Sequence, residues 1–198
     1  MEDQVTEPEA PARRGRPRSA TASRAILESA YRLMATSGAG AASIEAIARD
    51  CGASKMTIYK WWPTREALLI DAFLHHAETM LPLKGRGSAI QRIRAHAERY
   101  ATALAGEFGR VQLAVIAECI TASGSAEEFN ARYLGRRRTA IVAIITAGQV
   151  EGSIAATADA ETLYDAIYGA LFYRSAFAIE PLTPAYAREL TELALSPR

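Results

Sequence analysis

The sequence contains few of the residues on which secreted and membrane proteins depend. It has only two cysteines, Cys51 and Cys119, which lie far apart and outside any metal-binding motif. This argues against a disulfide framework and favours a reducing cytoplasm. No run of about 18 apolar residues, the length that a membrane-spanning helix needs, occurs. The N-terminus is acidic and then basic, without the apolar stretch of a secretory signal.

The sequence also lacks a set of residues that would support catalysis. It contains no Gly-x-Ser-x-Gly motif, no phosphate-binding loop and no dinucleotide fingerprint. His75 and His76 are adjacent, so they point to different faces of a helix and cannot form the i,i+4 pair that binds zinc. We expect no enzyme activity, no catalytic residue, no metal site and no cofactor.

Positive charge is concentrated in one part of the chain, although the net charge is only +1. Residues 1–12 carry four acidic side chains and no basic one, whereas residues 13–65 carry ten basic side chains against three acidic ones. Such a cluster is expected where the partner is a polyanion such as DNA. A basic surface that is merely solvated explains the charge equally well.

Periodic apolar residues predict an all-α fold of about nine helices. Hydrophobic residues make up 49% of the chain, which is enough for a packed core. The turn dipeptides Asn-Gly and Asp-Gly, which often join strands, are absent. The predicted helices cover about residues 21–36, 43–52, 54–61, 64–82, 88–105, 108–122, 126–150, 159–179 and 184–195.

Two short helices joined by a glycine lie between residues 43 and 62. Ser43 and Ser54 are suitable N-caps, Gly52 suits a left-handed turn, and Pro63 ends the second helix. A helix, a tight turn and a second short helix form the layout of a helix-turn-helix.

The second of these helices exposes an unusual set of side chains. Ala53, Ile58 and Trp62 are predicted to face the interior, because neighbours must hold so short a helix. The outward side chains combine amines, hydroxyls and apolar groups, a mixture that suits phosphates and base edges in a DNA groove. A helical hairpin that buries its aromatic residues is the alternative. The predicted outward residues are Lys55, Met56, Thr57, Tyr59, Lys60 and Trp61.

The stretch from Arg24 to Phe73 closely resembles the DNA-binding domain of TetR-family regulators. The likeness lies in the apolar first helix ending at Gly38, in Ser43-Ile44, in Cys51-Gly52-Ala53-Ser54, and in Thr57-Ile58-Tyr59-Lys60-Trp61-Trp62-Pro63 followed by Arg65-Glu66-Ala67-Leu68. Met56 departs from the pattern, since small residues or proline are usual there. Trp61-Trp62 also departs from it, because a tyrosine–phenylalanine pair is commoner.

The resemblance implies roles for individual residues. Ser43 and Arg65 are expected to contact backbone phosphates, and Glu45 either reaches a base amine or is an ordinary surface charge. The expected domains are a disordered arm at 1–19, a helix-turn-helix DNA-binding domain at 20–66 and a helical ligand-binding and dimerisation domain at 67–198. The expected DNA face comprises Lys55, Met56, Thr57, Tyr59, Lys60 and Trp61.

The basic arm Arg13-Arg14-Gly15-Arg16-Pro17-Arg18 has two interpretations. Gly and Pro keep it extended, so Arg14, Arg16 and Arg18 are able to enter a narrow A·T minor groove. An unspecific basic tail that only raises affinity is the alternative.

The last two helices predict a dimer. Between residues 159 and 179 the chain is apolar nearly all round, so this helix must be covered on both sides. In TetR-like proteins these helices form a homodimer interface, which presents two recognition helices to a near-palindromic operator in double-stranded DNA. A central helix buried within a monomer is the alternative. The expected interface residues are Ala166, Gly169, Ala170, Tyr173, Phe177, Tyr186 and Leu190.

By the same resemblance, the larger domain binds an unknown small-molecule effector. The chain is then a sequence-specific cytoplasmic regulator, a repressor that the effector releases from its operator, without membrane contact. An architectural DNA-binding dimer without an effector is the alternative. The run Arg136-Arg137-Arg138 is either a solvated or ion-paired face or an anion site. The pocket candidates, each also expected as ordinary core, are Tyr100, Leu104, Phe108, Ile116, Tyr133 and Phe172.

Overall fold

A computed structural model describes residues 20–83, 85–121, 127, 129–156, 158–179 and 181–195, and this part of the chain contains helices and loops but no strand. The N-terminal helices are α1 (Ala20–Ser37), the 3-10 turn η1 (Ala39–Ala41), α2 (Ile44–Cys51), α3 (Lys55–Trp61) and α4 (Arg65–Met80). The remainder forms α5 (Ala89–Leu104), α6 (Glu107–Thr121), the π-helical turn η2 (Asn130–Leu134), α8 (Gly135–Val150), α9 (Ala160–Tyr164), the π-helical turn η3 (Asp165–Gly169), α10 (Ala170–Ala176) and α11 (Pro184–Leu195).

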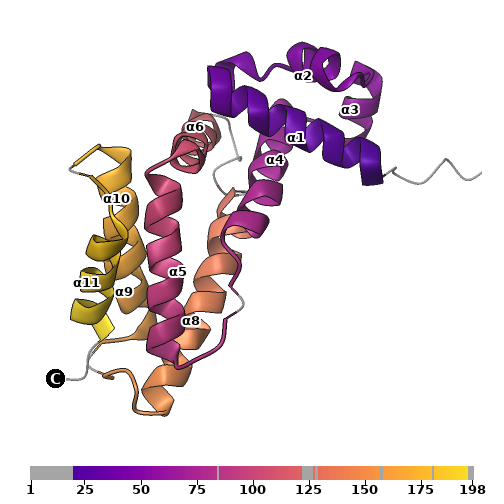
Figure 1. Cartoon of the computed structure of the whole chain (residues 1–198). Helices are drawn as coiled ribbons and strands as arrows, with labels where there is room; N and C mark the ends of the chain where they lie inside the picture. Colours follow the sequence, from indigo (N-terminus) through magenta and orange to yellow (C-terminus); the bar gives the residue numbers. More distant parts are fainter. Residues whose placement is uncertain are drawn as a thin grey trace, which may run out of the picture.

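Two parts of unequal size are joined by α4 (Figure 1). The group α1–α3 lies at one end of the molecule, with α1 crossing α4. From there α4 runs to a larger bundle in which α11 packs along α5 and α8 packs against α9. Where the two parts meet, α6 contacts both α1 and α4. Movement of α6 is therefore able to reach the N-terminal group directly.

The helix boundaries follow from capping residues that the sequence identifies. Ser43, Ser54 and Thr64 each accept a hydrogen bond at 3.1 Å from a backbone N–H three residues later. Gly52 ends α2 in the left-handed conformation, with φ 68°, which is favourable only for glycine. The predicted helix, turn and helix are confirmed at these positions.

The core is continuous from one part of the molecule to the other. Ile47 of α2, Ile58 of α3 and Leu69 of α4 are fully buried in the N-terminal part. Further along α4, the Phe73 ring packs at 5.1 Å from that of Phe108 and at 5.0 Å from that of Tyr133, measured between centroids. Burial of these large rings holds α4, α6 and η2 together.

The structure differs from the predicted helices in detail. The helix expected over 159–179 is divided by η3 and ends at Ala176, followed by Ala178 with a positive φ of 51°. The helix expected over 126–150 is described at residue 127 and from residue 129 onward, and it contains η2. Period-based prediction does not distinguish i→i+5 from i→i+4 hydrogen bonds, because the apolar stripe barely shifts. No helix among the described residues has the length and apolar character needed to cross a membrane.

Candidate DNA-binding surface and ligand pocket

One face of α3 is open to solvent although it carries apolar side chains. Met56 is 79% exposed and Tyr59 is 48% exposed, with Lys55 and Lys60 exposed beside them. The helical hairpin that buries its aromatic residues would have hidden Tyr59. Exposed apolar groups among amines instead indicate a binding surface.

The opposite face of α3 anchors the helix. Ile58 is fully buried and Trp62 is only 3% exposed, as predicted, while Thr57 and Trp61 are half-buried at the edge. The Trp62 indole Nε1 donates a hydrogen bond to Asp71 Oδ2 on α4 at 2.8 Å. Since a seven-residue helix is not stable alone, these contacts fix the orientation of α3.

A carboxylate at the end of α2 ties that helix to α1. The Asp50 side chain accepts hydrogen bonds from the Ser29 hydroxyl and the Arg32 guanidinium. The Ser29 hydrogen bond, with a smaller effect of Arg32, lowers the pKa of Asp50 below its usual value. Asp50 is therefore charged at neutral pH and holds α2 in place behind α3.

A salt bridge lies on the proposed DNA face itself. Lys55 Nζ donates to Glu45 Oε1 at 2.7 Å, and both side chains are more than half exposed. This hydrogen bond lowers the pKa of Glu45. An exposed pair of this kind is weak because water screens it, so a phosphate is able to compete with Glu45 for the ammonium group. The pair connects α2 with α3 across the face.

Ser43 and Arg65, the two expected phosphate contacts, are placed differently from one another. The half-buried Ser43 hydroxyl accepts from Ala46 N and keeps its own proton to donate. Arg65 is the exception to expectation, since its side chain is only 23% exposed. Its Nε donates to Ala42 O at 3.1 Å and its Nη1 to Glu118 Oε2 at 3.0 Å.

Arg65 also donates to the carbonyl of Ala39, so its guanidinium is engaged within the protein. Arg65 thereby links the start of α4 to η1 and, through Glu118, to α6, and its expected phosphate contact stays a prediction. The resemblance could not reveal the bond to Glu118, because that residue lies outside the matched stretch Arg24–Phe73. Arg14, Arg16 and Arg18 lie outside the described residues.

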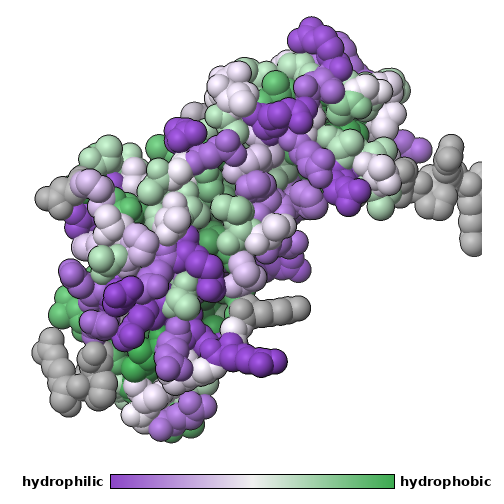
Figure 2. All heavy atoms as spheres, viewed as in Figure 1, coloured by the Kyte–Doolittle hydropathy of each residue, from purple (hydrophilic) through white to green (hydrophobic). Residues whose placement is uncertain are grey.

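The expected dimer residues form an open face of the single chain. Tyr173 is 57% exposed and Phe177 is 69% exposed, with ring centroids 5.2 Å apart. Figure 2 shows apolar residues on the outer surface near α10 and α11. The alternative of a helix buried within a monomer does not fit this exposure. Among the other candidates, Ala166 and Gly169 are exposed, and Ala170, Tyr186 and Leu190 are half-buried.

The larger part of the molecule contains a pocket of about 240 Å³ between α5, α6, η2 and the α9–η3–α10 segment. It brings together three of the six predicted residues, Tyr100, Ile116 and Phe172. Tyr133 lines a small adjoining cavity together with Tyr100. Gln112, Asn130, Leu134, Arg138, Tyr164, Asp165, Tyr168 and Gly169 complete the pocket lining.

Two of the predicted effector-pocket residues do not line this pocket, and their role stays a prediction. Phe108 packs on Phe73 and faces a separate groove toward α1. Leu104 lines a neighbouring recess of about 250 Å³ with Phe172 near the start of α6. Leu104 and Phe108 share a helix face with the pocket residues Tyr100 and Gln112, respectively, but each lies one turn away, where α5 ends and α6 begins.

A buried polar network borders the pocket. His96 Nδ1 lies 2.9 Å from the Tyr168 hydroxyl, and Arg137 Nη2 lies 2.8 Å from His96 Nε2 and donates to Leu81 O at 2.7 Å. Burial, reinforced by Arg137, lowers the pKa of His96 to about 3. The imidazole is therefore neutral: Nε2 accepts from Arg137 and Nδ1–H donates to Tyr168. This leaves the Tyr168 O–H as a donor.

Sequence reasoning missed a second polar pair at the pocket. Gln112 is 1% exposed, and its Nε2 donates to the Tyr100 hydroxyl at 3.1 Å. An amide inside the apolar run of α6 was an available signal. At the rim, Arg138 is bound to Asp165 and to Glu161, which explains one arginine of the 136–138 run as an ion-paired residue.

Family models match both parts of the chain. Residues 26–72 match the model described as "Bacterial regulatory proteins, tetR family", and residues 83–194 match "Tetracyclin repressor-like, C-terminal domain". The HTH-type transcriptional regulator YdeS of Bacillus subtilis (strain 168) is 34% identical over 178 residues, which cover 90% of each chain.

Solved structures are similar as well. The TetR family transcription regulator SCO0332 superposes with a TM-score of 0.73 at 26% identity, covering 87% of this chain and 96% of that one. A transcriptional regulator from Saccharomonospora viridis, solved in complex with choline, has a TM-score of 0.69 at 21% identity, covering 91% of this chain and all of its own.

Proposed function

Because the chain belongs to the TetR family of DNA-binding transcriptional regulators, we propose that it is a cytoplasmic, sequence-specific repressor that a small-molecule effector releases from its operator. The observation that supports this most directly is the geometry of α3. Its buried side is fixed by Ile58 and Trp62, while Met56 and Tyr59 face solvent between two lysines.

In this proposal α3 is the recognition helix that enters the major groove. Lys55, Lys60 and the Ser43 hydroxyl contact phosphates and position the helix. Met56 and Tyr59 contact base edges, where a thioether suits thymine methyl groups and a hydroxyl donates or accepts. Thr57 and Trp61 border the groove, and Arg14, Arg16 and Arg18 of the arm follow the adjacent minor groove.

A homodimer is proposed to read two half-sites. The open face that includes Tyr173 and Phe177 provides the apolar surface for a two-fold contact with a second copy. Two recognition helices then meet successive major grooves about 34 Å apart on a near-palindromic operator.

The effector is proposed to bind the pocket at Tyr100, Ile116 and Phe172. That a regulator of the same fold has been solved with choline supports the use of this fold for small ligands. The pocket is lined on one side by α6, which also carries Glu118, the partner of Arg65. An effector that shifts α6 changes this contact, and the favoured conformer then holds the recognition helices at an unsuitable spacing for DNA.

Operator binding provides the test. Selection of bound fragments from genomic DNA yields an operator, and its affinity is then measured by fluorescence anisotropy at several salt concentrations. We expect Lys60→Ala to weaken binding on every sequence and to lower the salt slope by about one, because one phosphate contact is lost.

Arg136→Ala is the matched control, because it removes one exposed positive charge from α8, far along the chain from α3. We expect its salt slope to equal that of the wild type. Equal slopes in all three proteins, or no affinity for duplex DNA at low salt, would refute the assignment of this face.

A further inference from the structure

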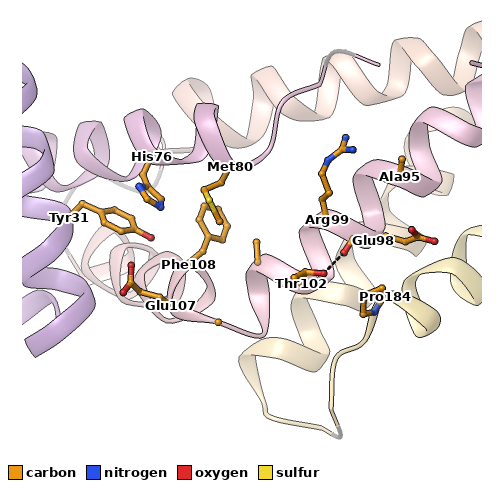
Figure 3. A pocket seen from close by; sticks show the side chains of 12 residues that line it. Tyr31, His76, Met80, Ala95, Glu98, Arg99, Thr102, Glu107, Phe108 and Pro184 are labelled. Carbon is orange, nitrogen blue, oxygen red and sulfur yellow. Dashed lines mark hydrogen bonds between the residues drawn. The ribbon is translucent and has the colours of Figure 1, made fainter. Parts of the chain in front are cut away.

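A second hollow lies where the two parts of the molecule meet (Figure 3). It is a groove of about 580 Å³ that shares no lining residue with the proposed effector pocket. One end is formed by Tyr31 of α1, His76 and Met80 of α4, and Glu107 and Phe108 of α6. The groove continues along α5 toward the start of α11.

Tyr31 carries a polar group with an unmet hydrogen bond at this end. The residue is 6% exposed, and its hydroxyl has no hydrogen-bond partner among the described residues. Its ring stacks on the His76 imidazole, with centroids 3.8 Å apart and planes at 20°. Burial raises the pKa of Tyr31 to about 12, so the hydroxyl keeps its proton and remains a donor. Burying a hydroxyl without a partner is unfavourable, so an acceptor at this position would be stabilised.

The same end of the groove is negatively charged. Glu107 is exposed in the first turn of α6, and no ion pair involving it occurs in the described part of the chain. Burial lowers the pKa of His76, so this imidazole does not offset the carboxylate. Arg110 acts on Tyr31 from the next turn of α6 but does not line the groove.

The charges at the other end of the groove are already engaged. Glu98 accepts a hydrogen bond from Arg188 Nε at 2.8 Å. Arg99 reaches the carbonyl of Pro82 at 3.4 Å. Glu107 is therefore the lining carboxylate that a ligand meets without displacing an ion pair in the described structure.

We propose that this groove is a second ligand site, which takes a small organic cation with an apolar body and a hydrogen-bond acceptor. The cation lies beside Glu107, the body packs on Met80, Phe108 and the face of the Tyr31–His76 pair, and the acceptor accepts a hydrogen bond from the Tyr31 hydroxyl. Since Tyr31 belongs to α1 and Glu107 to α6, the ligand bridges the two parts and alters operator affinity.

Procaine and benzocaine form a matched pair of probes. Both carry an aromatic ring and an ester acceptor, but only procaine is a cation at neutral pH. Isothermal titration calorimetry with the full chain is expected to show procaine binding about fivefold more tightly than benzocaine. Glu107→Gln is expected to abolish this difference, and circular dichroism checks that the variant folds. Equal affinities for the two probes in the wild type would overturn the proposal.

Tyr31→Phe tests the orphan hydroxyl. Procaine affinity is expected to fall about fivefold because a hydrogen bond is lost. The unfolding temperature of the ligand-free variant is expected to stay unchanged or rise, since the unsatisfied group is gone. A marked fall in that temperature would mean that the hydroxyl has a partner inside the protein, which contradicts the site.

Ile116→Ala in the proposed effector pocket separates the two sites. It is expected to leave procaine affinity unchanged. Loss of procaine binding in this variant would mean that procaine binds in the proposed effector pocket and not in the groove. Operator DNA is expected to shift procaine affinity by the same factor by which procaine shifts operator affinity. An unshifted value overturns the regulatory part of the proposal, whereas operator binding by the ligand-free protein tests the repressor proposal separately.

Discussion

A few single side chains hydrogen-bond to two or three helices at once and so fix the relative positions of those helices. Asp71 accepts the Trp62 indole N–H and also binds Arg132, so one carboxylate serves α3, α4 and η2. Arg65 connects η1, α4 and α6 in the same way, because its guanidinium donates hydrogen bonds to the end of η1 and to Glu118. Both residues are charged groups with one partner more than 50 positions away in sequence.

Replacing Arg65 separates a structural role from a phosphate contact. Arg65→Ala removes the donor to Ala42 O and to Glu118 and one of the two donors to Ala39 O, so we expect the free energy of unfolding to fall by about 1–3 kcal/mol in urea denaturation. Arg65→Lys is expected to recover only part of this, since one ammonium cannot match the geometry of a guanidinium. Lys60→Ala is the control, with a change within about 0.5 kcal/mol. If Arg65→Ala were as stable as the wild type and its operator affinity depended less steeply on salt, Arg65 would be a phosphate contact.

His96 predicts a dependence of stability on pH. Its pKa of about 3 in the folded protein lies below the ordinary 6.5, so the unfolded chain binds the extra proton as pH falls. Stability is therefore complete above pH 6.5 and decreases at about 1.4 kcal/mol per unit below it. The lowered pKa of His76 acts in the same direction.

Urea denaturation at pH 7, 6 and 5 checks this dependence. His96→Asn is expected to flatten most of the slope, although it lowers stability at pH 7 by disturbing Tyr168. The same slope in this variant as in the wild type would assign the effect to other groups. Carboxylates with lowered pKa values, such as Asp50 and Asp165, also stabilise the folded protein, but that contribution is lost at a more acidic pH, where they become protonated.

At the scale of elements, α2 and α3 behave as a unit because the turn between them is strongly specified. Gly52 stands at φ 68° with no atom within 4 Å of an added Cβ. Gly52→Ala thus meets backbone strain without a steric clash, and we expect a loss of about 1 kcal/mol in unfolding free energy. Gly40→Ala is the control, because its Cβ is also in open space and its φ is not in the left-handed region. Similar losses in both variants would argue against strain as the cause.

At the scale of the whole molecule, the open face on α10 makes oligomeric state and DNA binding interdependent. We expect Phe177→Arg to yield a monomer in analytical ultracentrifugation and to weaken operator binding by more than tenfold, since the two half-sites are then bound independently. Val150→Arg is the control, because Val150 is 85% exposed on α8, outside the proposed interface. If Phe177→Arg remained a dimer, the dimer interface would lie on another surface of the protein.

The local features of this chain follow from its sequence. Ser43, Ser54 and Gly52 set the limits of α2 and α3 through interactions within a few residues, which is why the helix-turn-helix was predictable. The apolar stripe of Leu163, Ile167 and Leu171 along α9, η3 and α10 follows in the same way, because the periodicity of an α-helix determines which side chains share a face. The break at η3 was not predictable, since one π-helical turn leaves the stripe nearly unchanged.

Only the tertiary structure decided which distant residues meet. Arg65 faces Glu118, 53 positions later, and His96 faces Tyr168, 72 positions later. It also decided that Phe108 turns toward Tyr31 rather than into the pocket with Tyr100. Periodicity states which side of a helix is apolar, but packing angles between helices determine what that side touches, and those angles depend on the shapes of all the side chains together.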